Sequence, residues 1–378
     1  MATIGLCSIN LKKAKTYDQA LEIVGQSPSP ATASAQSTSQ GAQANVLLNF
    51  DELLQQEVAV DTSFNPKDLI QSIIRPYIEQ KADPRVENVA ESLQEAISET
   101  MRKIMHSSAF QSLEGSWRGL MLLNNRLDTD RACKLHILDI SKTQLSEDLQ
   151  KGLAQSQLYK NIVEQAQIPG AKSFDLVLAD YAIDDNVDDV VLLQQLVEFA
   201  SAAEANLLAE ASPKFAGFDS WQQERPTTEG AEGESISSDV IQAWQTLRSL
   251  PAASNACIAT PRYMTRLPYG QKTSPTEKFQ FEELPSQGAH EYYLWGNGAY
   301  LLALLYVQNH FTDFVNQVND LPLHVYQDED GDEALKPCAE ALLTDTQAQF
   351  IKDAGFTVLR SIKNQNAVLI DGWRPAIK

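Results

Sequence analysis

The sequence predicts an α/β fold, with α+β as the alternative: a layered mixed sheet flanked by helices and preceded by a helical segment and a flexible tether. Three observations carry this prediction. From Cys133 to Ile370, short aliphatic stretches alternate with longer stretches of helical periodicity. Before them, Asn49 to Phe110 repeats apolar residues three and four apart. At 378 residues and 43% hydrophobic content, the chain can bury one large core or two moderate ones.

These observations predict three regions in chain order. Residues 1–45 are expected to form a flexible N-terminal arm, with a short strand around Ile4 to Leu11. Ser27 to Gln43 is built from Ser, Ala, Gln, Pro and Thr, a composition that buries too little apolar surface to fold. Residues 46–130 are expected to form a helical lead-in, and residues 131–378 the core.

The helical lead-in carries a long apolar stripe. Pro76 breaks its first helical run, "NPKDLIQSIIRPYI". The second run, "VENVAESLQEAISETMRKIM", places five apolar residues on one face of a helix: Val89, Leu93, Ile97, Met101 and Ile104. Such a stripe is expected to be buried against another element.

Two strands and an intervening helix are predicted to open the core as a β-α-β unit. "CKLHILDI" (Cys133 to Ile140) and "FDLVLADYAI" (Phe174 to Ile183) are short, aliphatic and bounded by polar residues, which predicts buried strands. The stretch between them has a helical pattern. Either Ser141 or Ser146 can accept hydrogen bonds from the free amides at its start.

A second long helix is predicted from Val187 to Ala211. Asp184, Asp185 or Asn186 can cap it, and the carboxylates favour the positive end of the helix dipole. The residues expected to face the sheet are Val190, Val191, Val197 and Leu208.

Four further segments complete the predicted order. Glu224 to Asp239 is polar and is expected to be a surface loop, and "NACIATP" predicts a central strand that Pro261 stops. Thr344 is predicted to cap a short helix, with Gly355 as its C′ residue and a strand starting at Phe356. "NAVLIDGW" predicts the last strand.

The net charge and the distribution of apolar residues argue against nucleic acids and membranes as partners. Asp and Glu total 50 against 30 Lys and Arg, and the net charge of −20 repels nucleic-acid phosphates and anionic lipids. No window approaches the roughly 20 apolar residues of a membrane span, and the N-terminus lacks the pattern of a secretory signal. We therefore expect a cytoplasmic protein that binds no nucleic acid and inserts into no membrane.

The sequence holds no catalytic, cofactor or metal motif. "GNG" at Gly296 to Gly298 lacks the third glycine and the preceding strand of a dinucleotide fingerprint. In "DEDGD", Asp328 to Asp332, the glycine comes too early for a calcium loop. The cysteines and histidines show neither metal-ligand spacing nor a nucleophile beside them: Cys7, Cys133, Cys257, Cys338, His106, His136, His290, His310 and His324. We expect no cofactor, no metal and no enzymatic activity.

Three stretches instead place bulky aromatic and arginine residues beside glycine: "SLEGSWRGLMLLNNRL", "TPRYMTRLPYG" and "LWGNGAY". Large rings next to glycine indicate close packing rather than an open pocket. Arg118, Arg262 and Arg266 are expected to be ion-paired within the subunit, with a subunit contact as the alternative.

In this order the three stretches resemble the large subunit of the contractile sheath of the type VI secretion system, the TssC/VipB family. The resemblance covers most of the chain, from near Ile70 through "MHSSAFQSLEGSWRGLMLL", "CKLHILDISKTQLSEDLQK", "FDLVLADYAI", "AGFDSW" and "FQFEEL". It implies a structural role for Trp117, Arg118, Gly119, Arg262, Arg266, Pro268, Tyr269, Gly270, Trp295, Gly296 and Asn297.

The resemblance implies a structural subunit that works by assembly. Its partners would be a small sheath subunit, further copies of itself or a second large subunit, the inner tube protein and a baseplate. Such sheaths assemble extended around the tube and shorten to drive it outward. The N-terminal segment is a candidate arm that adds a strand to an adjacent subunit, with a disordered tail as the alternative. The apolar residues of this arm are Ile4, Leu6, Ile9 and Leu11.

The sequence departs from the family at its C-terminal end. The family usually continues well past the block that resembles "LLTDTQAQFIKDAGFTVL", whereas this sequence stops at Lys378. One hypothesis is a divergent sheath building block whose interlocking strands come from a partner. Another is a non-polymerising adaptor or terminator at a sheath end or baseplate. An α/β enzyme of unknown substrate is the third.

Overall fold

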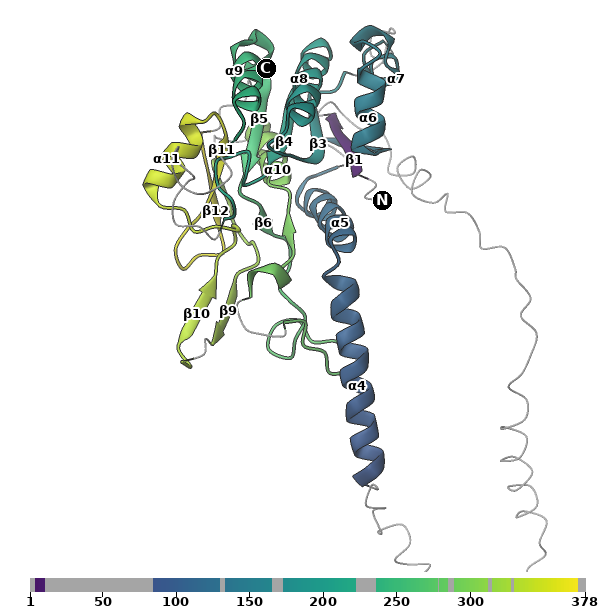
Figure 1. Ribbon diagram of the computed structural model, residues 1–378, viewed down its shortest axis with the longest axis vertical. Coiled ribbons are helices and arrows are strands. Elements are labelled where there is room, and N and C mark those ends of the chain that lie inside the picture. Colours follow the sequence, from purple (N-terminus) through teal and green to yellow (C-terminus); the bar gives the residue numbers. More distant parts are fainter. Residues whose placement is uncertain are drawn as a thin grey trace, which may run out of the picture. The chain divides into compact units, whose positions relative to one another are not determined.

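The computed structural model describes residues 4–10, 84–129, 133–164, 173–221, 236–277, 279–284, 289–311, 315–327 and 330–372 (Figure 1). The chain divides into two compact units, residues 1–16 with 94–378 and residues 17–93. All the described strands lie in the first unit, and their order confirms the predicted α/β class. The region boundaries expected near residues 45 and 130 stay predictions.

An eight-stranded mixed sheet forms the centre of the first unit. The strand bounds are β1 Ile4–Asn10, β2 Lys134–Ile140, β3 Leu176–Ile183, β4 Asn206–Ala211, β5 Ala256–Thr260, β6 Tyr263–Met264, β7 Trp295–Gly296, β8 Gln317–Val318, β9 His324–Gln327, β10 Glu333–Lys336, β11 Thr357–Ser361 and β12 Val368–Asp371. The sheet order is β2-β1-β3-β4-β5-β11-β12-β8, in which β3, β4, β5 and β11 run parallel. The pairs β6–β7 and β9–β10 form two separate antiparallel ribbons.

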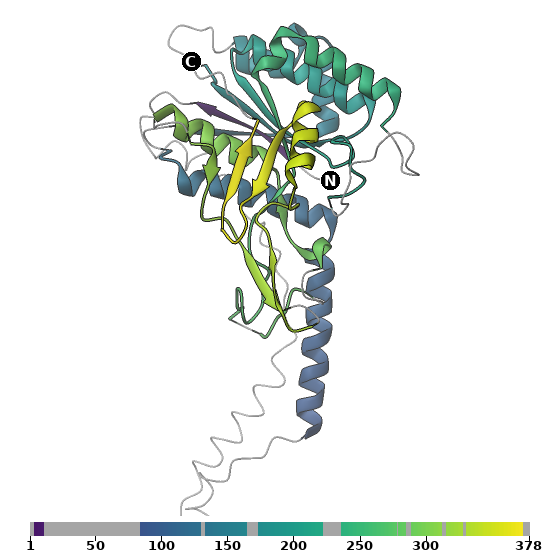
Figure 2. The same cartoon turned by 90° about the vertical axis from the view of Figure 1, so that its left-hand side faces the viewer.

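Helices cover both faces of this sheet (Figure 2). The α-helix bounds are α4 Pro84–Met105, α5 Ser108–Arg126, α6 Lys142–Leu149, α7 Gln157–Tyr159, α8 Val187–Ala202, α9 Ser238–Ser249, α10 Ala299–Phe311 and α11 Asp345–Asp353. A π-helical turn, η2 Lys160–Glu164, follows α7. Val177 and Ala179 of β3 pack in the core with α6, α8, α9 and α11, whereas Leu176 and Leu178 pack in the core with α5 and α10. Burial on both faces explains why β3 is almost continuously hydrophobic.

The predicted helix and strand ends are confirmed at several positions. Ser141 and Thr344 each form a capping box at the start of α6 and α11. Asn186 accepts a hydrogen bond from a first-turn amide of α8. Gly355 follows α11 at a φ of +99°, which glycine adopts without strain, and Pro261 follows β5 directly.

The prediction of one helix from Val187 to Ala211 is wrong. Helix α8 ends at Ala202, Glu204 adopts a positive φ of 54°, and the chain continues as the fully buried strand β4. The run "ANLLAEA" continues the apolar spacing of the helix, so periodicity alone does not separate the two elements. Of the residues expected to face the sheet, Val190 and Val197 are buried in α8, Leu208 is buried in β4 and Val191 is exposed.

Two apolar segments expected to be buried are exposed instead. β2 is an end strand of the sheet, and its residues from His136 to Asp139 are exposed. The stripe on α4 is also open to solvent, and its exposed members are Val89, Leu93, Ile97 and Ile104. Both segments have the apolar pattern of an interior element, but nothing in the described part of this chain buries them.

The N-terminal strand predicted around Ile4 to Leu11 is present as β1, although Leu11 itself lies outside the described residues. β1 lies between β2 and β3 and is antiparallel to both. In the single chain this segment therefore completes its own sheet, and its donation to a neighbour stays a prediction. The tether from Ser27 to Gln43 and most of the loop from Glu224 to Asp239 also lie outside the described residues.

Candidate functional site

The three aromatic and arginine stretches of the sequence meet around helix α5. This helix carries the first stretch and packs against α10 and the short strand β7, which belong to the third. The second stretch supplies β6, which pairs with β7. Segments more than a hundred residues apart in sequence therefore form one corner of the molecule (Figure 1).

A glycine on the inner face of α5 allows the helix to approach the core closely. A Cβ atom at Gly119 would lie 2.4 Å from the ring of Tyr300, which is 1% exposed and cannot move aside easily. A Cβ atom at Gly115, one turn earlier, would make only an ordinary contact of 3.4 Å with the main-chain oxygen of Trp295. The contact between α5 and α10 therefore requires glycine at position 119 but not at position 115.

Arg266 ties α5 to the chain that follows β6. Its guanidinium donates to both carboxylate oxygens of Glu283, at 2.6 and 2.8 Å. It also donates to both oxygens of Glu114 on α5, at 2.7 and 3.2 Å. Arg266 and Glu283 are 8% and 1% exposed, so this ion pair is buried. Losing one partner would leave an uncompensated buried charge, which is strongly destabilising.

The protonation states of this network follow from its contacts. Burial opposes ionisation of Glu114, but Arg266 and Arg118 outweigh burial and hold its pKa below the usual value. Burial likewise opposes the charge on Arg266, but Glu283 and Glu114 raise its pKa further above neutral. Burial lowers the pKa of His106, whose Nε2 lies 3.5 Å from Glu283. At neutral pH Glu114 and Arg266 are therefore charged, and His106 is neutral.

Arg118 and Tyr269 extend the network to the surface of the same corner. Arg118 donates to Glu114 at 2.7 Å and to the Tyr269 hydroxyl at 3.3 Å. The guanidinium of Arg266 lies 4.6 Å from the centre of the Tyr269 ring, a distance typical of cation–π contacts. The backbone N–H of Tyr269 donates to Glu283 at 2.8 Å. Each arginine on this side of α5 therefore has a carboxylate and an aromatic neighbour.

The remaining motif residues on this side shape the backbone. The carbonyl of Pro268 accepts a threonine hydroxyl at 2.6 Å, which closes a tight loop. A Cβ atom at Gly270 would lie 2.5 Å from a carboxylate oxygen of Glu282. A Cβ atom at Gly296 in β7 would lie 2.3 Å from the Thr265 methyl group. Gly296 therefore allows β7 to lie close to β6 and the residue that follows it, and Gly270 allows its loop to lie close to Glu282.

Arg262 forms a second ion pair beside the first. Its guanidinium donates to both oxygens of Glu340, at 2.8 and 2.6 Å. His290 lies 3.2 Å from Glu340 and stacks on Trp295 at a ring separation of 5.0 Å, and the Trp295 indole donates to the His290 carbonyl. Burial opposes ionisation of Glu340, but Arg262 outweighs it and lowers the pKa to about 2. Trp295 is buried in this corner, as the sequence predicted.

Two further carboxyl groups are buried without an ion pair among the described residues. Asp180 on β3 accepts hydrogen bonds from Asn297 at 3.1 Å and from the Tyr300 hydroxyl at 2.9 Å. Burial raises the pKa of Asp180 in spite of these donors. On the next strand, burial raises the pKa of Glu210 to about 8, although the charge of Arg262 opposes the shift. These carboxyl groups sit where α10 begins and link it to the sheet.

The outer face of α5 differs from the inner face because it is apolar and exposed. Phe110, Leu113, Trp117 and Met121 are 38, 44, 60 and 59% exposed. Their spacing of three, four and four residues places them on one stripe, here called the α5 stripe. The expectation that Trp117 packs closely is therefore wrong. The neighbouring glycine serves the opposite face of the helix, and the indole faces solvent.

Sequence reasoning found the arginines of this corner and missed the acids that pair with them. Glu114 and Glu283 lie within quoted stretches, and Glu340 lies outside them, yet none was named as the partner of an arginine. The signal available was chemical, because a buried arginine requires a carboxylate partner. The sequence alone does not say which of the many carboxylates supplies it.

The ion pairs and the close packing of this corner fix helix α5 in place. No group of three or more His, Cys, Asp or Glu side chains among the described residues could hold a metal ion. No helix in the same part of the chain is long and apolar enough to cross a membrane. What the corner provides is a helix fixed by buried ion pairs that presents an apolar stripe, and such patches mark interaction surfaces.

A fixed helix with an exposed aromatic stripe is typical of a protein that associates with other chains, and comparison with known proteins agrees. The tail sheath N-terminal domain family EvpB/VC_A0108, also called VipB, matches residues 87–374, and the chain belongs to this family. The chain is also similar to the type VI secretion system sheath protein TssC1 of Pseudomonas aeruginosa strain PAO1. The two are 29% identical over 306 residues, which cover 76% of this chain and 60% of the relative. The chain thus matches less than two thirds of that relative's length, and the predicted resemblance is confirmed.

Proposed function

We propose that this chain is a structural subunit of a contractile type VI secretion sheath and that the α5 stripe docks to another sheath subunit. The observation that carries the proposal is the stripe itself, with Trp117 60% exposed on a helix whose inner face is locked by ion pairs. Membership of the tail sheath family and the similarity to TssC1 support the assignment to a sheath.

The residues of the stripe suit a protein interface. Aromatic residues and methionine are enriched at the centres of interfaces, and tryptophan often supplies a large share of the binding energy. A rigid helix loses little conformational entropy when it docks, so more of the contact energy remains for binding. The ion pairs of Arg266 thus contribute indirectly, because they fix the helix before the partner arrives.

The partner that fits this role is the small sheath subunit, together with further large subunits. A contact between unlike surfaces that does not close on itself builds an open helix, the geometry that a sheath around an inner tube requires. Contraction then needs two packings of the same rigid subunits that differ in free energy. In this proposal the subunit acts by docking and catalyses no reaction.

The N-terminal arm belongs to the same proposal. β1 occupies a position between β2 and β3, and a long segment separates it from α4. The same strand from a neighbouring copy would make identical main-chain pairs, because exchanging an element between copies preserves its contacts. Ile4, Leu6 and Ile9 lie on this strand.

Co-expression with the small sheath subunit, followed by electron microscopy, tests the proposal. Long hollow cylinders are the expected product, and the small subunit expressed alone serves as the control. If only discrete complexes form, the chain does not build a sheath in this way. The role of an adaptor or terminator at a sheath end would then fit better.

A further inference from the structure

A second open surface lies along the outer edge of β2, away from the α5 stripe. The inner edge of β2 pairs with β1 along all seven of its residues, and no described strand pairs with the outer edge. The opposite end of the sheet is β8, which has only two residues. An open strand edge presents amide and carbonyl groups that accept another strand, and proteins usually protect it.

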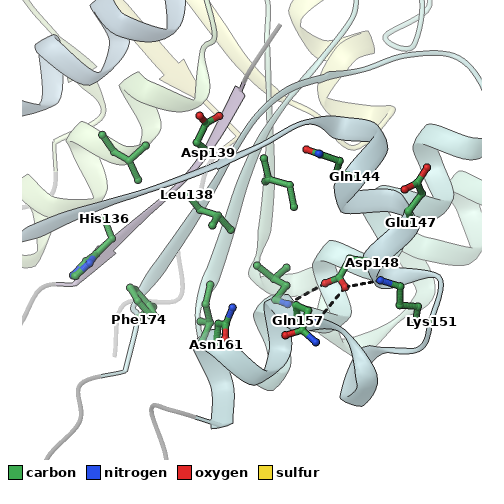
Figure 3. Close-up of a pocket in the computed structure, with 14 residues that line it drawn as sticks. His136, Leu138, Asp139, Gln144, Glu147, Asp148, Lys151, Gln157, Asn161 and Phe174 are labelled. Carbon is green, nitrogen blue, oxygen red and sulfur yellow. Dashed lines mark hydrogen bonds and ion pairs between the residues drawn. The ribbon is translucent and has the colours of Figure 1, made fainter. Parts of the chain in front are cut away.

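The outer edge of β2 also forms one wall of a cavity of about 550 Å³ (Figure 3). Five consecutive strand residues, His136 to Ile140, line this cavity. Because successive side chains point to opposite faces, a wall made of consecutive residues includes the main chain itself. Helix α6 and the turn from α7 into η2 form the facing wall, which contributes Glu147, Leu158 and Ile162.

The facing wall is fixed in place before any ligand arrives. Asp148 accepts the first amides of α7, from Gln157 at 3.1 Å and from Leu158 at 3.0 Å, and it pairs with Lys151 at 3.3 Å (Figure 3). This carboxylate therefore caps α7 and holds it against α6. A preformed wall lowers the entropy cost of binding.

The lining combines apolar surface with an excess of negative charge. Ile137 and Leu138 are 54 and 36% exposed, and Leu138 lies on the same side of the strand as Phe174 (Figure 3). The charged lining residues are three carboxylates and one lysine: Asp139, Glu147, Asp148 and Lys151. The His136 ring meets Phe174 edge-on at 5.4 Å, and partial desolvation together with the charge of Lys134 lowers its pKa, so it adds no positive charge at neutral pH.

We propose that the outer edge of β2 accepts an extended segment of another protein in which apolar residues alternate with lysine or arginine. Its main chain pairs with β2, one apolar side chain enters the cavity beside Leu138 and Phe174, and a cation meets Glu147. Strand addition of this kind takes its affinity from main-chain bonds and its specificity from side-chain pockets. A basic segment fits this site because its lining carries three carboxylates against one lysine.

A decapeptide of alternating lysine and valine is a defined probe for this site. Amide hydrogen exchange of the full chain is measured with and without the peptide. We expect exchange at the β2 amides to slow by roughly tenfold or more when the peptide is bound. A decapeptide of alternating glutamate and valine serves as the control. The proposal fails if the β2 amides are not protected, or if the acidic peptide protects them equally.

Two variants separate strand addition from general attraction of a basic peptide to an acidic protein. Leu138→Lys places a cation in the cavity and should abolish protection of β2. Val191→Lys, at a position on α8 that is 42% exposed, adds the same charge elsewhere and should leave protection unchanged. Thermal melting verifies that both variants are folded. Equal loss in the two variants, or no loss in Leu138→Lys, would overturn the proposal.

Discussion

The inner and outer faces of helix α5 differ in what their side chains contact. On the inner face, Glu114 is held by two arginines, and Gly119 lies directly against the ring of Tyr300. On the outer face, Trp117 and Met121 are about equally exposed and lie free of the core. The difference shows that charged pairs fix the position of the helix, whereas its apolar residues remain available to another chain.

The largest expected effect comes from breaking the inner face at its central ion pair. Arg266→Met leaves the carboxylate of Glu283, 1% exposed, without its cation. The free energy of unfolding should fall by about 3–5 kcal/mol, measured by urea denaturation. Arg360→Met is the matched control, because its partner Asp345 is 92% exposed and such pairs contribute about 1 kcal/mol or less. Equal losses would show that the Arg266 pair does not fix the corner.

The dependence of stability on pH tests the protonation of Glu210, a buried acid without an ion pair among the described residues. Glu210 has a folded-state pKa of about 8 against a usual value of 4.5, so the folded protein binds this proton more tightly. Its contribution to stability is complete below about pH 4.5 and is lost as the pH rises to about 8, at up to about 1.4 kcal/mol per pH unit. Glu210→Gln should remove this slope in urea titrations from pH 5 to 8. Parallel slopes in the two proteins would contradict the assignment.

Alanine substitutions at two glycines of α5, Gly115 and Gly119, should change the stability of the protein in opposite directions. Gly119→Ala forces a methyl group into the Tyr300 ring and should lower stability by about 1–3 kcal/mol. Gly115→Ala meets no such obstacle and should raise stability by up to about 1 kcal/mol, because alanine favours the helix. Guanidinium denaturation of the two variants measures both signs. The close approach of α5 to α10 would be in doubt if both variants behaved alike.

Local signals in the sequence predicted much of this fold. Thr344 was identified as a helix cap, and Ser141 and Asn186 were among the candidates for two others, because their side chains match the free amides of a first turn. β4 was missed because "NLLAEA" continues the apolar spacing of α8 and no glycine or proline separates the two. Capping side chains therefore predict where a helix begins, whereas a change from helix to strand within one apolar run leaves no such signal.

The candidate site was predictable in part. The sequence identified the three motif stretches and predicted that Arg266 is paired, and the structure places Glu114 and Glu283 beside it. It did not predict that Trp117 is exposed. Whether a tryptophan on an amphipathic helix faces the core or solvent depends on which face the tertiary structure covers, and the composition of one helix does not decide this.

The most direct test of the account is the effect of Trp117→Ala on recovery of the small sheath subunit in co-purification. Because Trp117 is exposed in the single chain, the melting temperature should stay unchanged, while recovery should fall by roughly tenfold or more, as at an interface hot spot. Val191→Ala, at a similarly exposed apolar position on α8, is the matched control and should retain full recovery. Equal recovery with Trp117→Ala and Val191→Ala would contradict the proposal that the α5 stripe is the docking surface.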